Sequence, residues 1–117
     1  MKIIKVEKVT IDLIKVFNLD INDELYSLEL DGNNIGYGII REDINKKLEI
    51  YILSEHQGRG YGTKLFGELL NIINKEVIVQ VNINNIIMRK ILMKYSAIEI
   101  GRNGEDIRYV IPNKGEL

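Results

Sequence analysis

The chain has 117 residues, 45% of them hydrophobic and 28% charged, which fits a single domain over residues 1–117 with one core. Its 16 basic and 17 acidic side chains leave a formal charge of −1, so no overall positive field favours binding to nucleic acid. The absence of cysteine excludes disulfides, thiolate zinc sites and a cysteine nucleophile, and a single histidine argues against a metal site. No apolar run approaches the roughly 20 residues that span a bilayer, and the first residues do not resemble a signal peptide. We therefore expect a soluble, cytoplasmic protein without membrane or nucleic-acid partners.

The first third of the chain predicts a strand, a short helix and a hairpin. Alternating apolar and charged residues predict the first strand over residues 2–8. Thr10 or Asp12 is suited to cap a short helix that ends near Asn18. Two apolar segments then flank residues that tolerate positive φ, which is typical of a hairpin turn. The two strands and the turn of this hairpin cover residues 25–30, 35–40 and 31–34.

The middle of the chain predicts a buried strand followed by a helix. Residues 48–53 are almost all apolar, so we expect a central strand that is covered on both faces. From Gly62 onward apolar residues recur at steps of three and four, which predicts a helix with one buried face. The residues of that face are Leu65, Phe66, Leu69, Leu70 and Ile73.

A further strand, a helix and a hairpin complete the chain. The strand covers residues 77–81, and Asn82 or Asn84 is suited to cap the helix after it. The apolar stripe of this helix is Ile87, Met88, Ile91, Leu92 and Tyr95. Residues 98–100 and 107–111 flank a Gly-rich turn at 101–104, which predicts a closing hairpin. The order of elements predicts an α/β (α+β) domain in which helices pack on a mixed sheet.

The chemistry of the chain is concentrated in the segment 57–63, which joins the central strand to the following helix. The first turn of a helix has unpaired N–H groups and a partial positive charge, which suits a phosphate. Glycines at this place allow the backbone to approach a ligand closely. Gln57 can donate an amide hydrogen, Arg59 can pair with a phosphate oxygen, and Thr63 can add a hydroxyl. The segment predicts a site for a diphosphate group, although a glycine-rich turn kept only for its geometry remains the alternative.

The pattern of this segment resembles one known family. The Gly-x-Gly-x-x-Gly motif does not fit, because Thr63 stands three residues after Gly60, and the P-loop pattern is absent. Gln57, Gly60 and Gly62 instead match the Gln/Arg-x-x-Gly-x-Gly/Ala signature of the GNAT superfamily of acetyl-coenzyme A dependent N-acetyltransferases. Residues 51–62 are also similar to the family's strand and loop consensus. The resemblance implies a mixed, mostly antiparallel sheet with a splayed central strand pair and helices on its faces.

The resemblance also implies which residues hold acetyl-coenzyme A, the expected cosubstrate. The backbone of Ile52 and Leu53 is expected to bond the pantetheine arm. The diphosphate is expected to contact the loop and helix start, namely Gln57, Gly58, Arg59, Gly60, Tyr61, Gly62 and Thr63. Family members often carry an Asn early in the next helix, and Asn85 is the best match. Asn84 is the competing choice, with a simple helix cap as its structural alternative.

Two departures from the family pattern concern the reaction itself. Family members often have a Tyr that protonates the departing thiolate, and Leu92 stands at that position here. Tyr95 is the nearest phenol on the same stripe, so it is a candidate acid, with a buried core Tyr as the alternative. The section between the first strand and Leu25 is short for a family that fits two helices there. We therefore expect a more open acceptor side, which a second copy in a homodimer would complete.

The resemblance implies direct transfer of acetyl to a primary amine of a small molecule or peptide, without a metal. The amine must lose a proton before it attacks, and Glu49, on the strand beside the cofactor, is the candidate catalytic base. A polar partner on the sheet face is the alternative role of Glu49. Glu55 and His56 adjoin the loop and are candidates to touch the acceptor, although a lone His near a loop is typically exposed. A regulatory module that binds acetyl-coenzyme A without catalysis, and an unrelated nucleotide-binding domain, are the alternative functions.

Overall fold

The protein forms one mixed sheet, seen in a computed structural model that describes residues 1–42 and 46–112. The described residues form seven strands in the order β1-β2-β3-β4-β5-β7-β6. All neighbours pair antiparallel except β4 and β5, which are parallel. The strands are β1 (Lys2–Lys5), β2 (Glu24–Leu30), β3 (Asn33–Arg41), β4 (Lys46–Ile52), β5 (Val77–Asn82), β6 (Ile98–Asn103) and β7 (Asp106–Ile111). The predicted fold class is confirmed.

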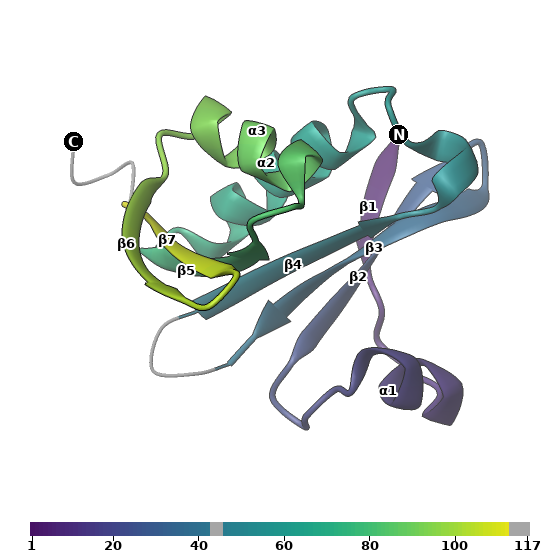
Figure 1. Ribbon diagram of the computed structural model, residues 1–117. Coiled ribbons are helices and arrows are strands. Elements are labelled where there is room, and N and C mark those ends of the chain that lie inside the picture. The colour runs from purple at the N-terminus through teal and green to yellow at the C-terminus, as the bar shows by residue number, and fades with distance from the viewer. Residues whose placement is uncertain (43–45, 113–117) are drawn as a thin grey trace.

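Helices cover both faces of the sheet to different extents. They are α1 (Ile11–Phe17), α2 (Tyr61–Ile73) and α3 (Ile86–Lys94), with a short 3-10 helix, η1 (Ser54–His56), before the glycine-rich loop. Figure 1 shows α2 and α3 together on one face and the short α1 on the other. Within the described ranges no helix combines the length and the apolar character needed to cross a membrane.

The main core lies between the sheet and the apolar faces of α2 and α3. Leu65, Phe66 and Leu69 of α2 are fully buried, as the stripe in the sequence predicts. On α3 the core residues are Met88, Ile91 and Leu92, whereas Ile87 is 65% exposed, so its predicted place on the buried stripe is wrong. This packing holds the start of α2 against the end of β4.

The ends of several elements differ from the prediction. The first strand ends at Lys5, because the chain leaves the sheet there to reach α1. The N-cap of α1 is Thr10, whose hydroxyl oxygen accepts a hydrogen bond from the amide of Leu13 at 3.2 Å. The turn of the closing hairpin lies at Gly104, which takes a φ of +62°, and not over 101–104. A bulge keeps Gly101 within β6, and this irregularity is invisible to a pattern of period two.

The prediction that the central strand is covered on both faces is wrong. β4 does lie in the middle of the sheet, between β3 and β5. One face of it packs under α2 and α3, but on the other face Tyr51 is 44% exposed. Phe17 at the end of α1 lies on this side, with its ring centroid 5.0 Å from that of Tyr51. The chain therefore leaves the face of the sheet beside α1 partly open.

Candidate functional site

The central feature of the site is a gap between two parallel strands. Within residues 46–112, β4 and β5 pair at Lys46 with Val77 and at Lys47 with Ile78, and then separate. This confirms the splayed strand pair. A cavity of about 280 Å³ lies where β4, the glycine-rich loop, α2 and α3 meet, and a second of about 200 Å³ lies between β4 and β5. The two cavities share Ile50, Asn85 and Met88 in their walls, so they adjoin through the gap.

The glycine-rich loop presents backbone amides to the larger cavity. Gly58 and Gly60 have φ values of +78° and +84°, which other residues adopt only with strain. Gly60 is also the N-cap of α2, so it offers no capping side chain, and the first turn of α2 contains no acidic residue. The amides of residues 61–63 have no carbonyl partner earlier in their own helix. This arrangement is suited to an anion, which the helix dipole also favours.

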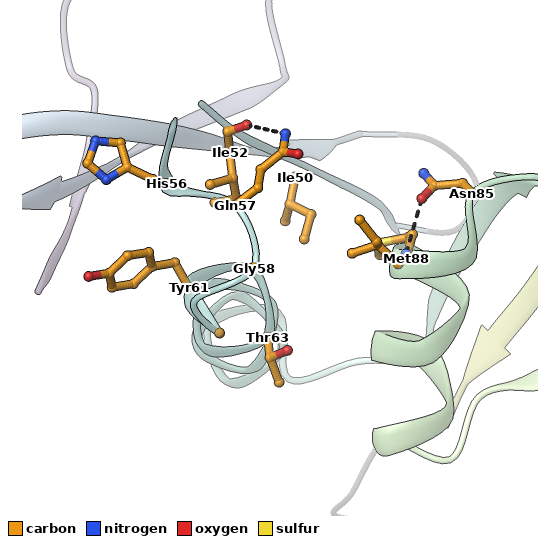
Figure 2. Close-up of a pocket in the computed structure, with 12 residues that line it drawn as sticks. Ile50, Ile52, His56, Gln57, Gly58, Tyr61, Thr63, Asn85 and Met88 are labelled. Carbon is orange, nitrogen blue, oxygen red and sulfur yellow. Dashed lines mark hydrogen bonds between the residues drawn. The ribbon is translucent and has the colours of Figure 1, made fainter. Parts of the chain in front are cut away.

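The side chain of Gln57 forms a hydrogen bond within the protein, which holds the loop against the end of β4. Its side-chain nitrogen donates to the carbonyl oxygen of Ile52 at 2.9 Å, as Figure 2 shows. The predicted donation to a diphosphate is therefore left to its second amide hydrogen. Arg59 is exposed, and the larger cavity is lined without it, whereas Tyr61 and Thr63 do line that cavity. Of the predicted loop contacts, the structure brings together all but Arg59.

One of the two β4 residues that were expected to bond the pantetheine arm has its backbone groups engaged elsewhere. The amide of Leu53 donates to Ile35 of β3 at 2.9 Å, and its carbonyl accepts from His56 at 2.9 Å. Leu53 is therefore wrong as a donor to the pantetheine arm. Since backbone groups point to alternate sides along a strand, the amides of Ile52 and Ile50 face the side of β5. Ile50 was missed, and the pairing of β3 with β4 is the information that identifies it.

Asn85 sits at the junction of the two cavities. Its side-chain oxygen accepts from the amide of Met88 at 3.1 Å and so caps α3 (Figure 2). The sequence suggested Asn82 or Asn84 as the cap, and this is wrong. Asn84 instead closes a local turn in which its amide donates to the side-chain oxygen of Asn82 at 2.9 Å. The cap fixes Asn85 so that its amide nitrogen remains a donor beside the gap.

Neither Leu92, which stands at the family's Tyr position, nor Tyr95, the candidate acid, lines either cavity. Leu92 is fully buried in the core. The hydroxyl of Tyr95 donates to the carbonyl oxygen of Thr63 at 2.8 Å, and its ring packs on Phe66 at 5.3 Å. Burial raises the pKa of Tyr95, so the phenol stays protonated. This geometry contradicts a place for the hydroxyl at the reacting atoms and favours the core alternative.

We expect Tyr95→Phe to leave the reaction intact. The variant removes one hydrogen bond between α3 and the first turn of α2, so the free energy of unfolding should fall by about 1 kcal/mol. Because the hydroxyl does not face the cavities, kcat should change less than about threefold, well below the 10²-fold or more that a general acid contributes. Urea unfolding and steady-state kinetics measure the two effects. A hundredfold fall in kcat would restore Tyr95 as the acid.

A polar cluster covers the opposite face of β4. The Nε of Arg41 donates to the carboxylate of Glu49, and its guanidinium donates to Asp23 at 3.1 Å and to the carbonyl of Phe17 at 2.6 Å. Tyr51 donates to Glu49 at 2.8 Å. Burial, and then this hydrogen bond, raises the pKa of Tyr51 to about 12, and the hydrogen bond to Glu49 raises the pKa of Arg41. The cluster ties α1 to β3 and β4, and it holds Glu49 at the wall of the smaller cavity.

His56 lies on the cofactor side of the gap. The sequence suggested an exposed histidine, but the residue is half-buried and lines the larger cavity beside Tyr61, with ring centroids 6.4 Å apart. Its buried Nδ1 has no hydrogen-bond partner within the described part of the chain. Glu55 is exposed next to it. His56 therefore belongs to the wall of the larger cavity, and not to the gap where an acceptor would enter.

Comparisons with known proteins agree with this geometry. A family model for the acetyltransferase (GNAT) domain matches residues 22–99. The fold is similar to that of spermidine N-acetyltransferase from Vibrio cholerae in complex with CoA and spermine, with a TM-score of 0.70 and 22% identity over 87% of this chain and 72% of that one. It is also similar to a dodecameric structure of that Vibrio enzyme, with a TM-score of 0.70 and 21% identity over 91% of this chain and 74% of the other.

A structure with lower sequence identity shares the fold as well. It is a domain from Methanocaldococcus jannaschii, with a TM-score of 0.74 and 13% identity over 86% of this chain and 73% of that domain. A search of curated protein sequences found no match to the chain. These structural similarities show the fold, and the family model covers most of the chain. The protein therefore belongs to the GNAT family of acetyltransferases.

Proposed function

We propose that the protein transfers an acetyl group from acetyl-coenzyme A to a primary amine by direct attack. The observation that carries the proposal is the junction of two features, the uncapped amides at the start of α2 and the gap between β4 and β5. The first suits a diphosphate, and the second leaves strand amides free for a pantetheine arm. The Vibrio relative described above is in complex with CoA and spermine, which supports the choice of cosubstrate and of an amine acceptor.

The residues of the larger cavity fit coenzyme A by the chemistry of their donors. The amides from Gly58 to Thr63 would hold the diphosphate, and the backbone of Ile50 and Ile52 would bond the pantetheine arm. Asn85 adds an amide donor where the two cavities meet. The cosubstrate would supply an acetyl thioester: the amine nitrogen bonds to the carbonyl carbon, the C–S bond then breaks, and coenzyme A leaves as a thiolate that takes a proton from water. The proposed reaction requires no metal. The strand amides beside the gap are also placed to stabilise an oxyanion.

Glu49 is the proposed proton acceptor for the attacking amine. It lies on the wall of the smaller cavity, with Arg41 donating to one carboxylate oxygen and Tyr51 to the other. Each oxygen has a second lone pair, so the carboxylate can still accept from an amine or a water. We expect Glu49→Gln to lower kcat by about 10²-fold or more while the Kd of coenzyme A stays within about twofold. An assay of free thiol release measures kcat, and calorimetric titration measures the Kd of coenzyme A. An unchanged kcat would leave Glu49 with only a structural role, as the hydrogen-bond partner of Arg41 and Tyr51.

The acceptor is to be identified by turnover. Purified protein with acetyl-coenzyme A and a panel of polyamines, lysine peptides and small amines should release free thiol and yield an acetylated amine.

One observation favours a second candidate, a regulatory module that binds acetyl-coenzyme A without catalysis: Leu92 and Tyr95 place no hydroxyl at the cavities. Binding of coenzyme A without turnover of any amine would favour that module. Failure to bind coenzyme A would exclude both candidates.

A further inference from the structure

The carboxylate of Glu49 is held at both of its oxygen atoms. The Nε of Arg41 donates to one oxygen, and the hydroxyl of Tyr51 donates to the other at 2.8 Å. A glutamate side chain has many rotamers, and holding it in one of them costs conformational entropy. The side chain of Glu49 is 35% exposed, so packing alone leaves it room to turn. The two donors therefore select the rotamer that places the carboxylate at the wall of the smaller cavity.

Arg41 is itself fixed by the end of α1. One Nη donates to the carbonyl oxygen of Phe17 at 2.6 Å, and the other donates to the carbonyl oxygen of Asn18 at 3.0 Å and to Asp23 at 3.1 Å. The last carbonyl groups of a helix lack partners within it and carry a partial negative charge, which suits a guanidinium. The side chain of Asp23 is 2% exposed and also accepts from the amide of Glu42 at 3.1 Å. The guanidinium therefore lies in a rigid frame.

The last residue of α1 also supports the second donor to Glu49. The ring centroid of Phe17 lies 5.0 Å from that of Tyr51 and 5.3 Å from that of Tyr37. Tyr37 and Tyr51 are partners in the pairing of β3 with β4, so the three rings form one group on the face of the sheet beside α1. Both donors to Glu49 thus depend on Phe17, Arg41 through its carbonyl group and Tyr51 through its ring.

These residues act on the site without belonging to its walls. The described walls of the two cavities contain neither Arg41 nor Phe17. A guanidinium is planar and its donors keep fixed relative directions, so a rotation at the helix end also moves the Nε that bonds Glu49. The rest of α1 is packed sparsely, because none of its residues is buried and Ile11 and Val16 are 69% and 73% exposed. The contacts of its last residue therefore contribute much of its attachment to the sheet.

We propose that the C-terminal end of α1 positions the proton acceptor of the reaction, with Arg41 and Phe17 as positioning residues that act through Glu49. The proposal rests on the proposed function, in which Glu49 accepts the proton of the attacking amine. It gives α1 a role in the reaction although α1 lies on the face of the sheet opposite α2 and α3 (Figure 1). Binding of coenzyme A belongs to the loop before α2 and should not depend on these residues.

Replacement of arginine by lysine tests the positioning role. Arg41→Lys keeps the charge beside Asp23, so the protein should fold, but it removes the planar fork that joins α1 to Glu49. The kcat should fall about tenfold or more, as expected for a displaced catalytic group, while the Kd of coenzyme A stays unchanged. Arg102→Lys is the matched control and should leave kcat unchanged. Arg102 also donates through Nε and an Nη to a glutamate, Glu99, at 3.0 and 2.7 Å, but on β6 and outside the walls of both cavities.

A double-mutant cycle separates an effect through Glu49 from a general loss of stability. If Arg41 acts through Glu49, Arg41→Lys should change kcat less than about twofold in protein that already carries Glu49→Gln. A purely structural effect would lower kcat by the same factor in both backgrounds. Phe17→Leu removes the ring beside Tyr51 and is a second variant for the cycle, with the same expected behaviour. Thermal unfolding shows that each variant is folded under the conditions of the assay, and either variant alone completes the cycle.

The outcomes distinguish this proposal from the proposed function. A fall in kcat that is present in the unaltered background and disappears in the Glu49→Gln background supports the positioning role. A fall by equal factors in both backgrounds, or a kcat that neither Arg41→Lys nor Phe17→Leu changes, would overturn it and leave acetyl transfer intact. An unaltered protein that binds coenzyme A but acetylates no amine would reject the proposed function and this proposal with it.

Discussion

Alanine in place of Gly36 is expected to destabilise the protein by about 3 kcal/mol, the upper range for overpacking a tight site. A Cβ on Gly36 would lie 2.4 Å from the carbonyl oxygen of Tyr51 and 3.3 Å from the Cα of Ile52. Both atoms are backbone of β4, so no side-chain rotation relieves the clash. The pairing of Gly36 with Ile52 must open, at the place where β4 supplies the wall of the larger cavity.

A neighbouring glycine on the same strand provides the control. A Cβ on Gly38 would also lie 2.4 Å from another atom, but that atom is the Cδ1 of the Leu69 side chain, which can move. We expect Gly38→Ala to cost about 1 kcal/mol, clearly less than Gly36→Ala. Urea denaturation followed by circular dichroism measures both free energies of unfolding. Equal losses for the two variants would contradict the close approach of β3 and β4.

Alanine in place of Gly60 is expected to weaken coenzyme A binding by about tenfold or more. At a φ of +84° an alanine is strained by about 1–2 kcal/mol, so the loop relaxes toward negative φ. After that relaxation the amides at the start of α2 no longer all point into the cavity. Because a charge-assisted hydrogen bond contributes about 1.5–3 kcal/mol, misdirecting one of them accounts for the loss.

Gly32 separates the effect on binding from the effect of strain. Its φ is +82°, and a Cβ there would also meet nothing within 4 Å, but it lies in the turn between β2 and β3. Gly32→Ala should therefore lose about as much stability as Gly60→Ala and leave the Kd of coenzyme A unchanged. Calorimetric titration and thermal unfolding of both variants measure the two quantities. Loss of affinity in both variants, or in neither, would contradict the role of the loop.

Several features that depend on neighbours in the sequence were predicted correctly, although the cap of α3, the place of Ile87 and the turn of the closing hairpin were not. The buried face of α2 can be predicted from the spacing of its own apolar residues, and this spacing placed Leu65, Phe66 and Leu69 in the core. The hairpin between β2 and β3 was predicted at the right place, but its turn is Asp31 and Gly32, with φ values of 52° and 82°, and not 31–34, because β3 already begins at Asn33. The glycine-rich loop was also predicted because strand, loop and helix follow each other directly.

Features that depend on distant residues were not predicted. Arg41 contacts Phe17, Asp23 and Glu49, which are 24, 18 and 8 positions away, and no local pattern links them. The hydrogen bond from the amide of Leu53 to the carbonyl of Ile35 follows from the register of β3 on β4, which the sequence does not reveal. These long-range contacts decide which groups remain free at the site. They explain why the place of the glycine-rich loop between β4 and α2 followed from the sequence, whereas the hydrogen-bond partners of Glu49 and Tyr95 did not.

The most direct test of the account is the affinity for compounds that share one thiol arm and differ in their phosphates. Coenzyme A and dephospho-coenzyme A both contain the diphosphate and adenosine, whereas pantetheine lacks both, so adenosine alone serves as the control for the nucleoside. If the amides at the start of α2 bind that group, calorimetry should find both diphosphate compounds bound at least about 100-fold more tightly than pantetheine, as two charge-assisted hydrogen bonds require. Equal affinity for all three compounds, or no binding of coenzyme A, would contradict the account.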